Sequence, residues 1–426
     1  MANTAFVKKL LTNKKWYHQR FDGAPFFILA VAEAETMVDK RRPKNSEAKV
    51  RVCFFNHGKA DWYLDKEDIE RGSKAVVTLA KKDKNISTKL LKAWHADELR
   101  YEQYFWQEFL PLNLKKLSNK ELLAIWHKAY KLYLARLTSS AIIDHFALGT
   151  DELVGRMLRQ ELKQKSGKKG YKESEFTNIF ATATAPVFQS FINLAEIELL
   201  KIITKLSKET LSDFQKRYFW INNNYTFGKV LPLEHFKKEV AVWRRSGKNL
   251  HIELKKLQNT PILNRRRKQV LFKQYKFSPL LKTLLKISED FTWWQDERKK
   301  STYLNTYIGT EILKEVARRS GYTVDELQYL ITSEISTVLE KSQPSRLDLR
   351  ERRANSVFVV RNDLCDVRTG SVVEQLRTAM LGTHKHDTVQ DIRGLTASLG
   401  RAIGKVKILK SSTEMSKIQK GDILVA

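Results

Sequence analysis

The sequence predicts a mainly α-helical protein with a mixed α/β segment at the N-terminus and a β-rich segment at the C-terminus. Apolar residues recur at spacings of three and four through much of residues 95–340, which is typical of amphipathic helices. Short runs of β-branched and aromatic residues occur instead before residue 90 and after residue 355. The chain has 426 residues, of which 42% are hydrophobic, so it is long enough for two or three domains with a sizeable core.

Residues 1–92 are the predicted α/β segment. Two strands are predicted over residues 50–55 and 60–64, on either side of the sequence Asn-His-Gly-Lys. A His-Gly pair suits a tight turn because glycine adopts positive φ at no steric cost. We therefore interpret His57 as a turn residue rather than a catalytic or metal-binding one.

Residues 93–343 are the predicted helical domain, and two capping boxes mark helix starts within it. In Ser118–Glu121 and in Thr323–Glu326, a hydroxyl residue precedes glutamate by three positions, so that each side chain can satisfy an exposed backbone N–H. The first box precedes an apolar stripe made of Leu122, Ile125, Trp126, Ala129, Leu132 and Tyr133. The second box predicts a helix over residues 327–339.

Two further stretches of this domain are predicted to be helical. Over residues 280–320, four apolar residues recur at intervals of four, and Gly321 is well placed to end the helix. These four are Leu304, Ile308, Ile312 and Val316. The uncharged stretch 176–195 contains too many polar residues for a membrane span, and we expect a buried helix that is broken near Pro186.

The C-terminal part of the chain is predicted to be rich in β-structure. Residues 344–388 are expected to form a β-hairpin and a helix that link the helical domain to the segment 389–426. Within this linker, the apolar run 357–360 and Arg361 are followed by a turn-forming Asn-Asp-Leu-Cys-Asp sequence. In the last segment, glycines punctuate residues 394–404, and short β-type runs follow.

The chain is strongly basic, with 77 lysines and arginines against 48 aspartates and glutamates and a formal charge of +29. The basic residues cluster in 40–51, 163–172 and 244–276. The last cluster contains the run Arg265, Arg266, Arg267 and Lys268. Such a field attracts nucleic acid, nucleotide phosphates or anionic lipid. Because no nucleic-acid-binding module accompanies the charge, we favour a generally basic surface.

Two groups of charged residues are candidate functional positions, and for each we favour a structural role. The first group is Arg352, Arg353 and Arg361. Planar guanidinium groups suit phosphate, but arginines beside a hairpin are usually surface residues. The second group is the pair Trp293-Trp294 with Asp296, Glu297 and Arg298, which in an active homologue could face a substrate. Packing of the two indoles beside a solvated charged face is the simpler interpretation.

Histidine and cysteine residues give little sign of catalysis or metal binding. His145 follows Asp144, but adjacent residues on a helix do not face each other, so we expect a core histidine. Cys53 and Cys365 lie far apart and lack the spacing of a metal site, which fits a reducing compartment. The N-terminus has no continuous apolar segment of the signal-peptide kind, so we expect a cytoplasmic protein with no membrane partner.

The glycine pattern near the C-terminus carries a resemblance to a known family. Residues 394–406 read G-x-x-A-S-x-G-x-x-x-G-x-V, and residues 421–426 read Gly-Asp-Ile-Leu-Val-Ala. The motif positions are Gly394, Ala397, Ser398, Gly400, Gly404, Gly421 and Asp422. The pattern resembles the start of the swivelling phosphohistidine domain, of β/β/α type, in phosphoenolpyruvate-utilising enzymes, the family of phosphoenolpyruvate synthase and pyruvate phosphate dikinase. Residues 293–299 and 315–321 resemble that family's helical linker more weakly.

The resemblance implies a kinase-like transferase that passes a phosphoryl group through a histidine on a mobile domain. In the family, the carrier histidine follows the Gly-Asp-Ile-Leu-Val-Ala strand, and no residue of this chain matches it. His384 and His386 precede the pattern and cannot take its place. We therefore assign no catalytic residue and expect this chain alone to be inactive, either as a fragment, which we favour, or as a degenerate member.

The resemblance also implies partners. ATP and Mg belong to the complete system, but this sequence has neither an ATP-grasp domain nor a phosphate loop, so no cofactor and no metal site is assigned to it. A separate ATP-binding subunit is therefore implied. The alternative function is a non-enzymatic basic helical module that binds nucleic acid or a partner protein. Aromatic residues interleave with basic ones in residues 268–277, as in single-stranded nucleic-acid binders, and such binding would be independent of sequence.

Overall fold

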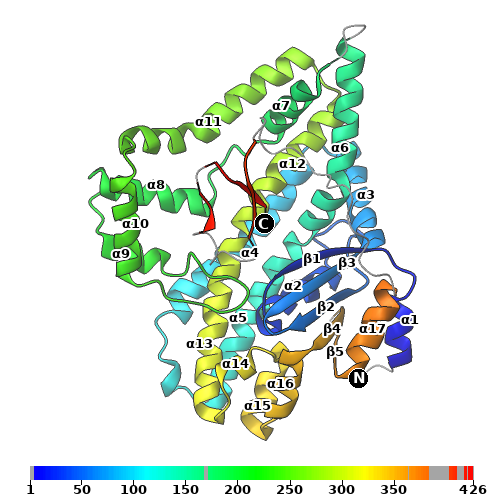
Figure 1. Ribbon diagram of the computed structural model, residues 1–426, viewed down its shortest axis with the longest axis vertical. Helices are drawn as coiled ribbons and strands as arrows, with labels where there is room; N and C mark the ends of the chain where they lie inside the picture. Colours follow the sequence, from blue (N-terminus) through cyan, green and yellow to red (C-terminus); the bar gives the residue numbers. More distant parts are fainter. Residues whose placement is uncertain are drawn as a thin grey trace.

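The computed structural model describes residues 4–166, 171–362, 364–382, 403–409, 417–419 and 421–425. The protein is mainly α-helical and elongated, as Figure 1 shows. In this view the larger sheet lies on the right in the lower half of the molecule, long helices run upward beside it, and a group of shorter helices lies on the left. The predicted fold class, mainly α with an α/β segment at the N-terminus, is confirmed.

The sheet has five antiparallel strands in the order β1-β3-β2-β4-β5. Its strands are β1 (Trp16–Asp22), β2 (Arg51–Asn56), β3 (Lys59–Asp65), β4 (Ser356–Arg361) and β5 (Leu364–Thr369). The predicted turn between β2 and β3 is present, with φ of 45° at His57 and 82° at Gly58. The β4–β5 hairpin lies where the sequence predicts it.

This sheet joins two parts of the chain that the sequence analysis treated as separate segments. Strand β2 pairs with β3 on one side and with β4 on the other, so that Arg51 lies opposite Val360. Residues 1–92 and 344–388 therefore share one sheet, and the helical region between them is inserted between its third and fourth strands along the chain.

Alternate residues of the strands pack against different layers, because successive side chains point to opposite faces. On one face, Phe55 and Phe358 pack in a core that includes α2 (Pro25–Thr36). On the other face, Phe54 and Val357 pack against α1 (Thr4–Leu11) and α17 (Ser371–Leu381). Both faces are thus covered by helices, which explains why β2 and β4 are buried along nearly their whole length.

The region from residue 95 to 340 is predominantly helical, as predicted. Its helices and those beside it are α3 (Lys66–Lys82), α4 (Ile86–Gln103), α5 (Asn119–Ser140), α6 (Ile142–Ser166), α7 (Glu173–Thr184), α8 (Phe191–Ile203), α9 (Leu211–Tyr218), α10 (Leu233–Arg245), α11 (Leu250–Tyr275), α12 (Pro279–Glu297), α13 (Lys299–Ser320), α14 (Val324–Leu327), α15 (Ile335–Lys341) and α16 (Arg346–Ala354). Helices α7 and α8 flank the break expected near Pro186.

Local capping determines several helix ends. The backbone N–H of Ser118 donates to Glu121 across 2.7 Å, and the predicted capping box opens α5. Gly321 ends α13 with a φ of 75°, as predicted. The apolar stripe of α13, from Leu304 to Val316, is fully buried.

The prediction of one continuous helix over residues 327–339 is wrong. The box at Thr323 is present, but the helix that it opens, α14, ends at Leu327, and α15 begins only at Ile335. The carboxylate of Glu334 accepts a hydrogen bond of 2.9 Å from the backbone N–H of Ile331, which starts a new turn there. Local bonds of this kind, next to Thr332 and Ser333, compete with continuous helix.

Within the described C-terminal residues, β6 (Val406–Ile408) and β7 (Ile423–Val425) pair in parallel. The described residues of 404–426 therefore contain β-structure, as expected. Among the helices that the structure describes, none is both long and apolar enough to cross a membrane.

Candidate functional site

The strongest candidate site is a cavity of about 300 Å³ between the sheet and the junction of α12 and α13. Its lining residues come from two strands, five helices and two connecting segments. They are Gln19, Phe21, Ile28, Val31, Glu35, Trp62, Leu64, Leu137, Asp144, Leu148, Tyr225, Gln295, Arg298, Lys299 and Thr302. Gln19, Leu148 and Gln295 are exposed at its mouth, whereas Trp62 and Thr302 are buried in its wall.

Sheet register positions the aromatic wall of the cavity. Gln19 of β1 lies directly opposite Trp62 of β3, so their side chains share one face of the sheet. Phe21, two residues further along β1, lies on the same face. Its ring centroid is 6.4 Å from that of Trp62 and 5.9 Å from that of Tyr225. These three rings form one continuous aromatic surface.

The charged wall of the cavity is an ion pair between two helices. Nη2 of Arg298 donates to Oδ1 of Asp144 across 2.7 Å, and the two side chains are 18% and 20% exposed. The backbone carbonyl of Arg298 accepts hydrogen bonds from Arg136 and from Thr302, which fix the junction between α12 and α13. Asp144 thus holds the guanidinium at the cavity, while Arg136 and Thr302 hold the backbone of Arg298.

Electrostatics favour a permanent charge on Arg298. Burial opposes that charge, but the nearby carboxylates, above all that of Asp144, outweigh the effect, and the pKa of Arg298 lies above its ordinary value. Burial raises the pKa of Tyr225, although Arg298 acts in the opposite direction, so the phenol stays protonated. Glu35 is buried beside Arg51, and desolvation raises the pKa of its carboxyl.

The residues of the cluster predicted at 293–298 have different surroundings in the structure. Trp294 is fully buried and packs on Trp94 with ring centroids 5.4 Å apart. Trp293 donates its indole N–H to the carbonyl of Gln189 across 2.8 Å. Both tryptophans therefore serve packing, which was the favoured interpretation. Arg298 alone of this cluster lines the cavity.

The two acidic residues of that cluster have separate surroundings. Asp296 pairs with Lys299 across 2.9 Å on the surface. Glu297 accepts a hydrogen bond of 2.9 Å from the backbone N–H of Phe191. Burial raises the pKa of Glu297 to about 7, so this carboxyl titrates close to neutrality.

His145 is a core histidine, as expected. Its ring is fully buried, and its Nε2 lies 2.6 Å from Nη2 of Arg51. Burial, together with Arg51 and Arg42, lowers its pKa well below the ordinary value, so the ring is neutral. Asp144 pairs with Arg298 instead, and the two adjacent residues form no dyad.

The three arginines near the hairpin have separate surroundings. Arg352 forms two hydrogen bonds of 2.7 and 2.9 Å with the carboxylate of Glu334. Arg353 is about half exposed and lies 3.7 Å from Asp325. Arg361 lies over the ring of Phe6, 4.9 Å from its centroid. Each arginine therefore has a structural contact of its own, and the guanidinium of Arg352 is occupied by the carboxylate of Glu334.

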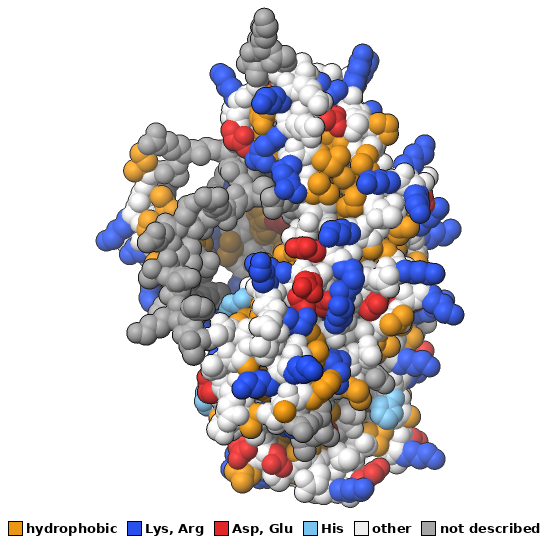
Figure 2. Space-filling model, turned by 90° about the vertical axis from the view of Figure 1, so that its right-hand side faces the viewer, with side chains coloured by type: hydrophobic (Ala, Val, Ile, Leu, Met, Phe, Trp, Pro, Cys, Tyr) orange, Lys and Arg blue, Asp and Glu red, His pale blue; other side chains and the backbone are white. Residues whose placement is uncertain are grey.

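The basic run on α11 is divided in the same way. Arg265, Arg266 and Arg267 are exposed. Lys268 is buried, pairs with Glu289 and donates to the carbonyl of Ala185 across 2.8 Å. The expectation that Lys268 belongs to an exposed basic patch is therefore wrong. Its side chain points toward Glu289 of α12 instead. Figure 2 shows lysine and arginine dispersed over another face of the molecule, consistent with a generally basic surface.

Of the seven motif positions, Gly394, Ala397, Ser398 and Gly400 lie outside the described residues. Gly404 lies against Gly421, and a Cβ atom at Gly404 would overlap the carbonyl oxygen of Gly421. Gly421 has a φ of 102°, a conformation that glycine adopts without strain. The carboxylate of Asp422 accepts a hydrogen bond of 2.9 Å from the backbone N–H of Gln419. The described motif residues thus support the parallel pairing of β6 and β7.

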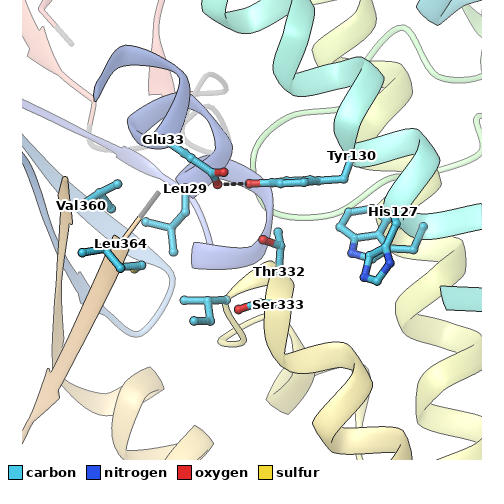
Figure 3. Close-up of a pocket in the computed structure, with 11 residues that line it drawn as sticks. Leu29, Glu33, His127, Tyr130, Thr332, Ser333, Val360 and Leu364 are labelled. Carbon is cyan, nitrogen blue, oxygen red and sulfur yellow. Dashed lines mark hydrogen bonds between the residues drawn. The ribbon is translucent and has the colours of Figure 1, made fainter. Parts of the chain in front are cut away.

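A second cavity, of about 430 Å³, lies between α2, α5, residues 331–333 and the β4–β5 hairpin. Figure 3 shows the hydroxyl of Tyr130 donating to Glu33 across it, with Leu29, Val360 and Leu364 on one side. Cys365 also lines this cavity, but burial raises the pKa of its thiol far above the usual range, so it is not a thiolate nucleophile. We therefore consider this cavity the weaker candidate.

When the chain is compared with protein-family models, with curated proteins and with solved structures, nothing matches it. Across the described residues, no group of three or more His, Cys, Asp or Glu side chains is arranged to hold a metal ion. The sequence places Arg298 in a candidate cluster but gives no sign of its pairing with Asp144 or of the nearby rings of Phe21 and Trp62. Only the tertiary fold brings these residues together, and no local motif signals them.

Proposed function

We propose that the chain is a component of a cytoplasmic phosphotransferase of the phosphoenolpyruvate-utilising type. In this proposal it supplies the helical linker and the first strands of a swivelling phosphohistidine domain. The observation that supports the proposal is the close approach of Gly404 to Gly421 between paired strands. The segments around Gly404 and Gly421 both resemble the start of the family's swivelling domain, and they lie side by side in this chain.

The glycines have a physical reason to be there. Ile423 donates its backbone N–H to the carbonyl of Lys405 across 2.9 Å. This hydrogen bond holds the backbone at Gly404 in contact with the turn that precedes β7. A side chain at Gly404 would meet the backbone of Gly421, which cannot move aside as a flexible side chain can. Glycine at positions 404 and 421 therefore fits the close pairing of β6 with β7.

In the proposed system, a histidine outside this chain would take a phosphoryl group from ATP and pass it to an acceptor. Dividing the transfer into two steps through phosphohistidine lowers the barrier of each. ATP and Mg would bind to a separate ATP-binding subunit. This chain would position the mobile domain and would turn over no ATP by itself.

The DNA that follows codon 426 tests the proposal. We expect a reading frame that continues into a Thr/Pro segment and a Ser-His-Ala motif. The polypeptide extended in this way, incubated with labelled ATP and the ATP-binding subunit, should acquire a phosphoryl group that is labile in acid and stable in base. A stop codon at that point, or label that is stable in acid, would contradict the proposal.

A second candidate function is non-specific binding of nucleic acid. The observation that favours it is the exposure of Arg265, Arg266 and Arg267 on one long helix. Consecutive exposed arginines suit contacts to phosphates, which carry no sequence information. The burial of Lys268 reduces this patch to three arginines and weakens the case for it.

A further inference from the structure

The cavity at the α12–α13 junction has the composition of a ligand site. Its volume of about 300 Å³ is at the lower end of the range for small organic ligands, about 300–1,000 Å³. Its lining combines the aromatic rings of Phe21, Trp62 and Tyr225 with the charged side chains of Asp144 and Arg298. Apolar walls with a few convergent polar groups are typical of sites that bind a small molecule in one orientation.

Arg298 and Tyr225 bring to this cavity hydrogen-bond donors that have no protein partner among the described residues. In the described part of the chain, the guanidinium of Arg298 makes one hydrogen bond, through Nη2, although it carries five N–H donors. The hydroxyl of Tyr225 likewise makes no hydrogen bond to another described residue. Asp144 fixes the orientation of Arg298, and Glu35 pairs with Arg51. The donors that remain on Arg298 and Tyr225 suit the oxygen atoms of an anion.

We propose that this cavity binds a small aromatic anion. Its flat ring would lie against Phe21 and Trp62, and its carboxylate, sulfonate or phosphate group would accept hydrogen bonds from Arg298 and Tyr225. The inference goes beyond the proposed phosphoryl transfer and does not depend on it. It requires only that the cavity be accessible through its mouth at Leu148, which is 37% exposed.

Two fluorescent probes test the inference. They are 8-anilinonaphthalene-1-sulfonate and N-phenyl-1-naphthylamine, which share one ring system but differ in the sulfonate. We expect the sulfonate to bind the wild-type chain at least tenfold more tightly than the neutral amine. Arg298→Gln should weaken binding of the sulfonate at least tenfold and change binding of the amine less than threefold. Equal affinity of the wild-type chain for the two probes would overturn the proposal.

A second pair of variants locates the binding. Leu148→Trp fills the mouth of the cavity and should weaken the binding of both probes at least fivefold. The matched control is Val242→Trp, which places the same side chain at an exposed position of another apolar cavity, formed by α8, α9 and α10. We expect this control to bind both probes as the wild type does. If Val242→Trp abolishes binding and Leu148→Trp does not, the probes bind at the other cavity and the inference is wrong. This comparison does not depend on whether Arg298→Gln folds.

Discussion

Arg298 and Asp144 form an ion pair of 2.7 Å that ties the α12–α13 junction to the first turn of α6. Both side chains are about four-fifths buried, so most of the water that would screen the pair in solution is absent. The pair therefore differs from an exposed ion pair such as that between Asp296 and Lys299, where both side chains are more than two-fifths exposed.

This difference predicts unequal effects of two conservative substitutions. Asp144→Asn leaves Arg298 partly buried without a charged partner and should lower the free energy of unfolding by about 1–3 kcal/mol. Asp296→Asn removes an exposed pair and should change it by less than about 0.5 kcal/mol. Urea unfolding followed by circular dichroism measures both values. Equal losses would show that burial of the pair has no energetic consequence.

Lys268 is predicted to stabilise the fold, whereas its neighbour Arg267 is not. Among the described residues, Lys268→Ala leaves Lys286, 3.2 Å away, as the one cationic partner of the buried carboxylate of Glu289. We expect a loss of about 2–4 kcal/mol in the free energy of unfolding. The exposed Arg267→Ala should cost less than about 0.5 kcal/mol. Denaturant titration of the two variants compares them, and a stable Lys268→Ala protein would refute the assignment.

Glu297 predicts a specific dependence of stability on pH. Its pKa is raised from 4.5 to about 7 by burial, so between these values the folded protein binds more protons than the unfolded chain. The stability contribution of this group is therefore present at pH 4.5 and is lost as the pH rises to 7. Glu297→Gln keeps an oxygen that can accept from Phe191 and removes the titration.

We expect Glu297→Gln to match the wild type near pH 4.5 and to exceed its stability above pH 7, by at most about 3 kcal/mol. Unfolding titrations at half-unit steps of pH show the gap between the two proteins directly. A gap that is constant with pH would mean that the carboxyl of Glu297 has its ordinary pKa.

The two cysteines are predicted to be unreactive in the folded protein. Burial raises the pKa of Cys53 and of Cys365 well above the usual range, so little thiolate is present at pH 8. Labelling with 5,5′-dithiobis(2-nitrobenzoate) should be slow compared with free glutathione. In urea, both thiols should react at the rate of glutathione. Rapid labelling of one thiol without denaturant would contradict the burial of that residue.

Binding of nucleic acid, if it occurs, is predicted to be independent of sequence and steeply dependent on salt. Contacts from arginines to phosphates release counterions, and the affinity falls as the salt concentration rises. Replacing Arg265, Arg266 and Arg267 with alanine should weaken binding equally for all sequences and flatten the salt dependence. Mobility-shift titrations at several salt concentrations measure both effects. Binding that persists at high salt, or that prefers one sequence, would contradict this view of the charge.

Features that depend on neighbouring residues could be predicted from the sequence. The capping box at Ser118, the turn at His57 and the helix end at Gly321 each involve only a few consecutive positions. Features that depend on the tertiary fold could not. The pairing of Arg51 with Val360 joins distant parts of the chain, and no local pattern specifies it.

The same distinction explains the errors at the candidate residues. Four consecutive basic residues suggested one exposed patch, but successive positions of a helix point in different directions, and Lys268 is on the side of α11 that faces α12. Arg298 was recognised only as part of a charged cluster. Its role at the cavity depends on Asp144, Phe21 and Trp62, which three other elements supply.

The insertion of the helical region between β3 and β4 has a consequence for folding. During synthesis, β2 emerges early, but the strand that pairs with its other edge, beginning at Ser356, emerges only after all the helices up to α16. Sheets with such a high contact order form slowly, and an unpaired edge strand is a template for association with other chains. The edge of β2 therefore lacks its partner strand while the segment from α3 to α16 is being synthesised, and during this interval it is open to association with other chains.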